Sequence, residues 1–319
     1  MLLAADPVGW GKPEYVRFEA RAMGSALSLI LADGSSARHD WASVIAEFEA
    51  AEAAMSRFRE TSEVTRLNQT AGSGRAICVS MRLRRALVLA DRATRMTDGR
   101  FDPRVLPDLD RLGYRGAAVP PGAAPTGSGP VVRRHGRAGL DIERAVDLGG
   151  IGKGLTLRWA ADILERAGRR DYLLDAGGDI VARGMSPDDG PWRVGIEDPT
   201  GDSESTAVIE VSDLAVATSS TRVNRWTVDG RTVHHLLDPR TREPADRGLV
   251  AVTVAGPDPA WAEVWSKDLF LSGAASIATR ARSRGLAAWW VADDGALEMT
   301  AAARALTIWV RAEEVDRAV

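Results

Sequence analysis

Residues 145–154 read Ala-Val-Asp-Leu-Gly-Gly-Ile-Gly-Lys-Gly, and an apolar helical pattern begins at Leu155. A glycine-rich turn that opens a helix presents unpaired backbone N–H groups to an anion, and Lys153 adds a point charge there. The spacing is not that of a Walker A loop, because Asp147 and Gly154 stand where that loop needs Gly and Ser or Thr, and it is not GxGxxG. From the residues alone, the stretch is either a phosphate-binding turn or a tight turn with a solvated lysine.

On both sides of this turn, the hydrophobic pattern predicts helices and strands in uneven alternation. Apolar residues recur at helical spacing in Trp41–Ser56, Met81–Thr97, Leu155–Ala167 (with Gly168 as its C-cap) and Ala260–Leu271. Short apolar runs and hairpin turns predict strands at Val16–Leu31 (interrupted at Met23-Gly24), Tyr172–Asp175, Ile180–Arg183, Trp192–Ile196, Ala207–Val211, Arg225–Val228, Thr232–Leu237, Leu249–Ala255, Ala288–Val291 and Ala296–Thr300. This pattern favours an α+β fold over a regular βαβ array.

The 319 residues could make two domains, but mixed folds of this size also occur as one. We expect a loose tail at residues 1–14 and one domain over 15–319. Residues 116–139 are rich in Pro and Gly and predict a surface loop.

Composition excludes several classes of protein. The formal net charge is −3, so the basic excess of a dedicated nucleic-acid binder is missing. The sequence contains no apolar run long enough for a membrane span and no secretory signal, so we expect a cytoplasmic protein. The single cysteine, Cys78, excludes an internal disulfide framework, and its apolar neighbours predict a buried structural thiol.

Two segments of the second half carry groups that could serve a site. Asp175-Ala-Gly-Gly-Asp179 reads as a strand, a glycine pair and a strand, where a ligand could approach the backbone closely, although such turns are common. His234 and His235 are adjacent in a strand, so their side chains point to opposite faces and only one can serve a given site. A purely structural role is the alternative for either histidine.

The segment 261–269 predicts a helix with two faces. Trp261, Trp265 and Leu269 repeat every four residues and form a core stripe. Glu263 and Lys267 are also four apart on another face, in the order that favours an ion pair, and a surface salt bridge is the simplest interpretation.

Seven motifs then follow one another in a specific order. They are Met23-Gly24-Ser25; Ser56-Arg57-Phe58 with Ser62-Glu63-Val64 and Arg66-Leu67-Asn68; Gly99–Pro107 (GRFDPRVLP); Asp147–Gly154 (DLGGIGKG); Gly177-Gly178-Asp179; Ala217-Thr218-Ser219-Ser220; and His235–Pro239 (HLLDP). In this order, the chain resembles the FAD:protein FMN transferases, the ApbE-type flavinyltransferases, over roughly residues 16–310.

The resemblance implies a mixed α/β flavinyltransferase-like fold that holds FAD between its two halves. It also implies transfer of FMN from FAD to a Ser or Thr hydroxyl of an acceptor flavoprotein, with release of AMP. Such phosphoryl transfer depends on positioning and on neutralising developing charge. In that frame Lys153 would face the diphosphate and His235 would take the proton from the attacking hydroxyl.

The same resemblance implies a set of binding residues. The segments that contain Asn68 and Asp102 would line the flavin pocket, and Asp179 would have a polar role. The full set of predicted cofactor-binding residues is Met23, Asn68, Asp102, Gly150, Gly152, Lys153, Gly178, Asp179, Thr218, Ser219 and Lys267.

The metal site that the family implies is altered here. Relatives hold Mg²⁺ with a backbone carbonyl of the Gly-Lys segment and with Asp and Thr side chains, and the corresponding residues are Gly152, Glu263 and Lys267. Glu263 remains an oxygen ligand that Mg²⁺ accepts, whereas a protonated Lys267 only donates hydrogen bonds. The family's Asp that follows the signature lysine is Arg158 here. We therefore predict that Gly152 and Glu263 are the metal ligands, or that Lys267 supplies part of the charge that Mg²⁺ would supply.

Two alternatives to FMN transfer stay open at this point. An FAD hydrolase that yields FMN and AMP needs the same phosphate site with water in place of the hydroxyl. A non-catalytic flavin-binding protein would explain the replacements at Arg158 and Lys267.

Overall fold

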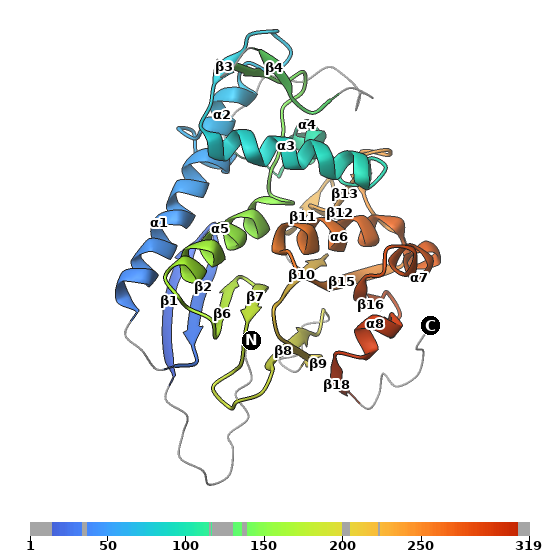
Figure 1. The fold of residues 1–319 in the computed structure, drawn as a ribbon. Coiled ribbons are helices and arrows are strands. Elements are labelled where there is room, and N and C mark those ends of the chain that lie inside the picture. The colour runs from blue at the N-terminus through green and yellow to red at the C-terminus, as the bar shows by residue number, and fades with distance from the viewer. Residues whose placement is uncertain are drawn as a thin grey trace.

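The computed structural model describes residues 15–33, 37–114, 116, 130–135, 139–199, 205–222 and 224–311. Figure 1 shows a layer of helices above a central sheet, with a small helical region at the top of the view.

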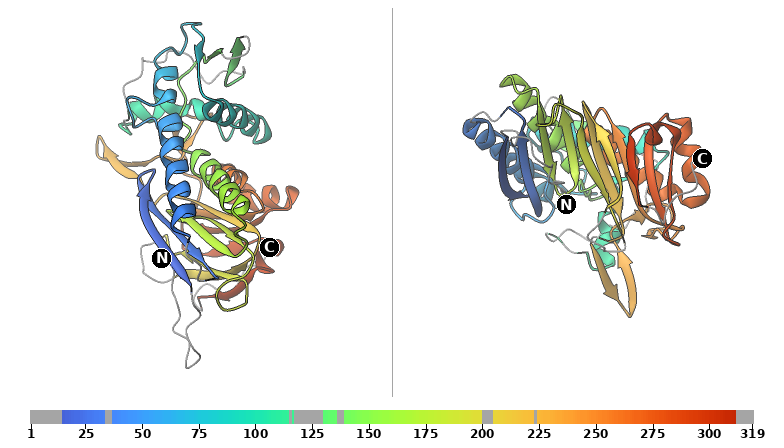
Figure 2. Two further views of the ribbon diagram at one scale, coloured as in Figure 1. Left: turned by 60° about the vertical axis from the view of Figure 1, so that its left-hand side comes forward. Right: turned by 90° about the horizontal axis from the view of Figure 1, so that it is seen from below.

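An eight-stranded sheet forms the centre of the described fold, in the order β1-β2-β6-β7-β10-β15-β16-β17 (Figure 2, right). All of its neighbouring strands pair antiparallel. The strands are β1 (Val16–Ala22), β2 (Ser25–Leu31), β6 (Tyr172–Ala176), β7 (Asp179–Arg183), β10 (Leu214–Ser220), β15 (Leu249–Gly256), β16 (Ala287–Ala292) and β17 (Leu297–Met299). A sheet in which every neighbouring pair is antiparallel confirms the α+β prediction.

Helices cover one face of this sheet and a small second sheet covers the other (Figures 1 and 2). The helices are α1 (Arg38–Met55), α5 (Gly152–Arg166), α6 (Pro259–Ser272) and α7 (Ala274–Ser283), and the second sheet has the order β18 (Thr307–Val310), β9 (Ser205–Val211), β8 (Trp192–Glu197). Successive strand residues point to opposite faces, so Leu29 packs under α1 and α5 whereas Ile30 packs against β8 and β9. Both faces of the sheet are therefore buried.

A cap joins the top of α1 to the rest of the chain. It consists of α2 (Glu63–Asn68), α3 (Met81–Met96), the 3-10 turn Pro103–Val105, α4 (Leu106–Arg111) and the three-stranded sheet β3 (Ile77–Cys78), β5 (Gly139–Asp141), β4 (Arg133–His135). Its apolar side chains form one cluster with the start of α5 and with α6. The cap is thus fixed to the two helices that border the site.

The remaining elements are short. They are the hairpin β11 (Arg225–Val228) and β12 (Arg231–His234), the pair β13 (Leu237–Asp238) and β14 (Glu243–Pro244), and α8 (Ala301–Arg304). The β11–β12 hairpin projects from the main body beside α4 (Figure 2, right).

The helices and strands predicted from periodicity are found, with ends that differ by a few residues, except that the predicted strand Thr232–Leu237 is divided: β12 ends at His234 and β13 begins at Leu237. Helix α5 begins at Gly152, inside the glycine-rich turn and three residues before the predicted start. Strand β10 and helix α7 were not predicted, nor were the short helices α2, α4 and α8 and the short strands β3, β4, β5, β14 and β18.

Two expectations have a different outcome. Cys78 is exposed, so the prediction of a buried thiol is wrong; its strand of two residues lies at an edge of the small cap sheet. The predicted loop at 116–139 contains the strand β4, and most of its other residues lie outside the described part of the chain, as do residues 1–14. Among the described residues, no helix combines the length and the apolar character that crossing a membrane requires.

Candidate active site

A cavity of about 330 Å³ lies where the cap meets the central sheet. It is lined from the turn after α3, the start of α5, the β6–β7 turn, strand β10, the loop after β12, and α6. Ten of the predicted site residues lie around it: Asp102, Gly150, Lys153, Gly178, Asp179, Thr218, Ser219, His235, Glu263 and Lys267. The structure thus brings together segments that are far apart in the sequence.

The glycine-rich turn is held in shape by Asp147. One carboxylate oxygen of Asp147 accepts a hydrogen bond from the backbone N–H of Gly149 at 2.7 Å, and the other lies 3.0 Å from Nε of the buried Arg57. The turn then leads directly into the first turn of α5. The positive end of this helix therefore points at the cavity wall, as an anion site requires.

Lys153 and Asp179 form an ion pair across the cavity floor. The Lys153 side chain comes from the first turn of α5, and Asp179 is the first residue of β7. Burial alone would lower the pKa of Lys153, but the charges of Asp179 and Glu263 outweigh it and raise the pKa. Asp179 also accepts the backbone N–H of Thr218 in β10 at 3.3 Å. Lys153 is thus held protonated and in a fixed position.

Glu263 is a buried carboxylate that links two helices. Its Oε2 accepts the backbone N–H of Gly154 at 2.8 Å, and Nζ of Lys267 lies 3.9 Å from its Oε1. Burial raises the pKa of Glu263 to about 7, against the opposing charge of Lys267. Because only 2% of Glu263 is exposed, the pair is not the surface salt bridge that was the simplest interpretation of the spacing.

Strand β10 is tied to its neighbours by hydroxyl groups. Thr218 and Thr253 lie with their hydroxyl oxygens 2.9 Å apart, and Ser219 and Ser266 with theirs 2.8 Å apart. Ser266 precedes Lys267 in α6, so the second of these hydrogen bonds fixes α6 over the strand that lines the cavity.

The two adjacent histidines have different surroundings. His235 lines the cavity, with its ring 6.3 Å from the ring of Tyr114. The Nε2 of His234 lies 3.1 Å from the carbonyl oxygen of Ala245, and its Nδ1 accepts the backbone N–H of Leu236 at 3.3 Å. His234 therefore holds the backbone on which His235 stands. The two were predicted to lie in one strand, but β12 ends at His234 and His235 follows it.

The loop after His235 is fixed by a buried aspartate. Asp238 is 1% exposed and accepts hydrogen bonds from the side chains of Arg240 and Arg247. Burial would raise the pKa of Asp238, but the hydrogen bonds from Arg240 and the nearby positive charges lower it overall.

Three predicted residues do not line the cavity. Asn68 is fully buried, and its side-chain amide donates to the carbonyl of Val146 and accepts its N–H, both at 2.9 Å, so it supports the segment before the glycine turn. Met23 forms the β1–β2 turn with a φ of 50°. The buried Gly152 has its carbonyl oxygen 2.7 Å from the hydroxyl of Thr156, which donates to it. These positions support the walls of the site from behind.

An aromatic group at the cavity mouth was not predicted. Tyr114 stacks on Trp226 with ring centroids 5.0 Å apart and meets Phe58 edge to face at 5.8 Å. Phe58 is 56% exposed and lines the cavity. The Arg57 guanidinium lies between these rings, 4.8 Å from the Tyr114 centroid. In the sequence, only the Ser56-Arg57-Phe58 motif pointed to this group, and no function was predicted for that motif.

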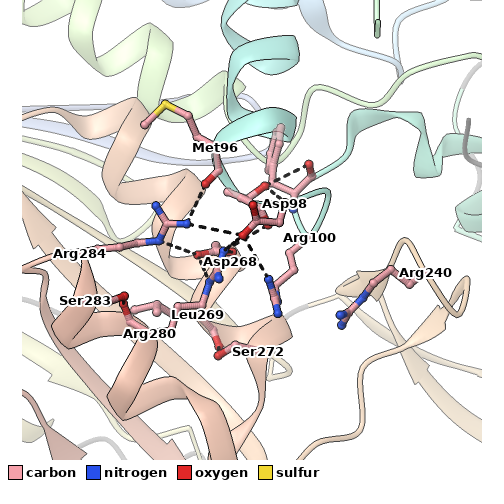
Figure 3. Close-up of polar contacts among 12 residues, drawn as sticks. Met96, Asp98, Arg100, Arg240, Asp268, Leu269, Ser272, Arg280, Ser283 and Arg284 are labelled. Atoms are coloured by element: carbon pink, nitrogen blue, oxygen red, sulfur yellow. Dashed lines mark hydrogen bonds and ion pairs between the residues drawn. The ribbon is translucent and has the colours of Figure 1, made fainter. Parts of the chain in front are cut away.

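An arginine-rich cluster surrounds Asp98 and Asp268 (Figure 3), and one of its members, Arg100, lines the same cavity. Arg280 of α7 donates two hydrogen bonds to the buried Asp268 of α6, at 2.7 and 2.8 Å. Arg100, which lines the cavity, has Nη1 3.8 Å from Asp98 Oδ2. Burial and the positive charges of Arg280 and Arg240 lower the pKa of Arg100. The cluster locks the turn after α3 against α6 and leaves positive charge at the cavity edge.

The side chains present do not fit a divalent metal ion. Among the described residues, no group of three or more His, Cys, Asp and Glu side chains is placed to share a metal ion. Of the two predicted ligands, Glu263 faces the ammonium of Lys267, and the carbonyl of Gly152 already accepts a hydrogen bond from Thr156. A protonated lysine repels a metal cation and offers it no lone pair.

Comparison with known proteins gives a consistent result. The model of the ApbE family matches residues 23–290. An FAD:protein FMN transferase from Klebsiella pneumoniae is 29% identical over 295 residues, which cover 87% of this chain and 84% of that protein. One from Escherichia coli is 32% identical over 151 residues, which cover 47% of this chain and 43% of that protein.

Solved structures agree with the sequence comparison. The crystal structure of the ApbE protein from Thermotoga maritima matches with a TM-score of 0.81 at 26% identity, covering 92% of this chain and 100% of that one. The flavin transferase ApbE from Vibrio cholerae matches with a TM-score of 0.77 at 26% identity, covering 92% and 99%. From the family match, the fold and the ordered motifs around one cavity, we conclude that the chain belongs to the ApbE family.

Proposed function

We propose that this protein transfers FMN from FAD to a Ser or Thr hydroxyl of an acceptor protein and releases AMP. The observation that carries the proposal is the convergence of Lys153, at the start of α5, and His235, after β12, on one cavity. The relatives from Klebsiella pneumoniae and Vibrio cholerae are FAD:protein FMN transferases, which supports the same reaction.

Lys153 and the start of α5 are the groups that bind the diphosphate in this proposal. The ammonium is held in place by Asp179, and the helix end adds its partial positive charge. Charge that develops on the diphosphate oxygens during transfer is then met by groups that are already oriented, which is the main source of rate enhancement in phosphoryl transfer.

His235 is the proposed general base. The acceptor hydroxyl oxygen attacks the phosphorus of the FMN half, the bond between this phosphorus and the bridging oxygen breaks, and AMP leaves with the bridging oxygen. The hydroxyl proton passes to the imidazole of His235, since histidine is the side chain that most often accepts a proton in general-base catalysis. His234, on the same backbone, keeps the position of His235 fixed.

The remaining predicted residues act as walls and supports. Asp102, Gly150, Gly178, Thr218 and Ser219 line the cavity, and we assign them to binding of FAD as donor substrate. The acceptor protein is proposed to enter at the mouth, where Phe58, Tyr114 and Trp226 are gathered. A cytoplasmic location of the reaction remains a prediction from sequence.

The test uses proteins of the source cell as acceptors. A lysate of cells that lack the gene is incubated with FAD and the purified protein and is then separated under denaturing conditions. Fluorescent flavin that stays with discrete protein bands, only when the protein was added, supports transfer. Free FMN and AMP without labelled bands would indicate hydrolysis, and recovery of all FAD intact would indicate a binding protein.

A further inference from the structure

Lys267 is the second lysine that lines the cavity. Its side chain, 19% exposed, comes from α6 and lies beside the glycine-rich turn at the cavity wall. A Cβ at Gly150 would stand 2.9 Å from Cε of Lys267 and 2.9 Å from Cε2 of Phe101. The lysine stem therefore packs directly against the backbone of the glycine-rich turn.

The pairing of Lys267 differs from that of Lys153. Asp179 holds the ammonium of Lys153 in direct hydrogen-bond contact. By contrast, Nζ of Lys267 lies 3.9 Å from Oε1 of Glu263, beyond hydrogen-bond range, and this oxygen accepts no hydrogen bond within the described residues. The ammonium has three donors, so its donors stay available to an anion in the cavity.

Glu263 is already engaged in contacts within the protein. Its other oxygen accepts the N–H of Gly154, and its side chain is 3% exposed. A divalent ion at Glu263 would have to sit within a few ångströms of the Lys267 ammonium, in a poorly solvated place where like charges repel strongly. The Lys267 ammonium and a divalent metal ion at Glu263 therefore exclude each other.

We propose that the Lys267 ammonium is the cation that binds the FAD diphosphate in this protein, so that FAD binding and FMN transfer proceed without a divalent metal ion. The inference rests on the proposed function for the transfer step, and on the cavity alone for the binding step. Lys153 of α5 and Lys267 of α6 both line the cavity, and Lys267 is the one whose ammonium is not in hydrogen-bond contact with a carboxylate.

The test measures FAD affinity through the quenching of flavin fluorescence. The protein is treated with EDTA, and FAD is titrated in EDTA or in excess Mg²⁺. The expected dissociation constants agree within about twofold. Lys267→Met should weaken FAD binding by about tenfold or more, the size expected when one charge-assisted hydrogen bond is lost, with no recovery in Mg²⁺. Lys267→Arg should keep most of the affinity.

Arg158→Met is the matched control. Arg158 is a cation on the neighbouring helix α5, but its guanidinium pairs with Asp258 and does not line the cavity. Removing it changes the net charge as Lys267→Met does, and FAD affinity should stay within about twofold of the original. Circular dichroism of each variant checks that the fold is kept, and if Lys267→Met does not fold, the EDTA comparison on the unmodified protein decides alone.

The outcomes separate this inference from the proposed function. FAD binding that needs Mg²⁺, or that is the same in Lys267→Met, overturns the inference even if FMN transfer is observed. A dissociation constant for FAD that is unchanged by EDTA and raised in Lys267→Met supports the inference. This holds even if no acceptor is labelled and the proposed transfer fails. Transfer observed only when Mg²⁺ is added would also overturn it.

Discussion

Glu263 accepts a hydrogen bond from the backbone N–H of Gly154 at 2.8 Å, and this contact joins α6 to the first turn of α5. The N–H is one of those left unpaired at a helix start, so the carboxylate completes the helix end that faces the cavity. The helix crossing is close, because a Cβ at Gly154 would stand 2.4 Å from the carbonyl oxygen of Pro259.

Two substitutions at Glu263 separate the effect of its hydrogen bond to Gly154 from the effect of the space that its side chain fills. Glu263→Gln keeps an oxygen that can accept the Gly154 N–H, so we expect a loss of unfolding free energy of only about 1 kcal/mol. Glu263→Ala removes the acceptor and leaves a cavity, and should cost about 3 kcal/mol or more. Urea denaturation measures both. Equal losses in the two variants would show that the hydrogen bond is unimportant.

Lys153→Met should weaken FAD binding and abolish transfer, because it removes the charge proposed to face the diphosphate. It also leaves Asp179, which is 3% exposed, as a buried carboxylate without its partner, so stability should fall by about 3 kcal/mol. The double variant Lys153→Met with Asp179→Asn should regain stability but not FAD affinity. Calorimetry and flavin titration give the two readouts, and a double variant that binds FAD normally would contradict the assignment.

His235→Gln tests the proposed general base. The turnover number should fall by about 10²–10⁴-fold, the usual contribution of a positioned base, while the dissociation constant for FAD changes little. Thermal melting checks the fold. An unchanged turnover number would remove His235 from the mechanism.

His234 predicts a pH dependence of stability. Burial lowers the pKa of His234, and its Nδ1 accepts the N–H of Leu236, a contact that a protonated ring cannot make. A folded-state pKa below the unfolded value of about 6.5 means that the unfolded chain binds the proton first, so stability is lost as pH falls below that value. Urea denaturation at pH 7.5 and pH 5 should show a smaller difference in His234→Asn. The same difference in both proteins would locate the titrating group elsewhere.

Local sequence patterns predicted most elements of this fold, for physical reasons. Alternation and helical spacing report which residues face a core, and the Asp229-Gly230 pair predicted the β11–β12 hairpin because both residues adopt positive φ there, 49° and 77°. Strand β10 could not be found this way, since it becomes a strand by pairing with β7 and β15, which are distant in the sequence.

The same distinction between local patterns and long-range contacts applies to the site. The motif residues Lys153, Asp179 and His235 could be singled out, and the structure places them around one cavity. The contacts that hold them could not be read from spacing, because each joins separate segments: Arg57 to Asp147, and Glu263 to Gly154. Asn68 was expected in the pocket wall, but it lies behind the wall and supports Val146.

The stoichiometry of one reaction tests the proposed FMN transfer most directly. A labelled acceptor protein from the lysate experiment is purified and incubated, in its unmodified form, with FAD and catalytic amounts of this protein. Mass spectrometry then counts the FMN groups attached, and chromatography counts the AMP released. We predict one AMP for each FMN bound to a Ser or Thr of the acceptor, with His235→Gln far slower. AMP released without modified acceptor, or FAD that remains intact, would contradict the account.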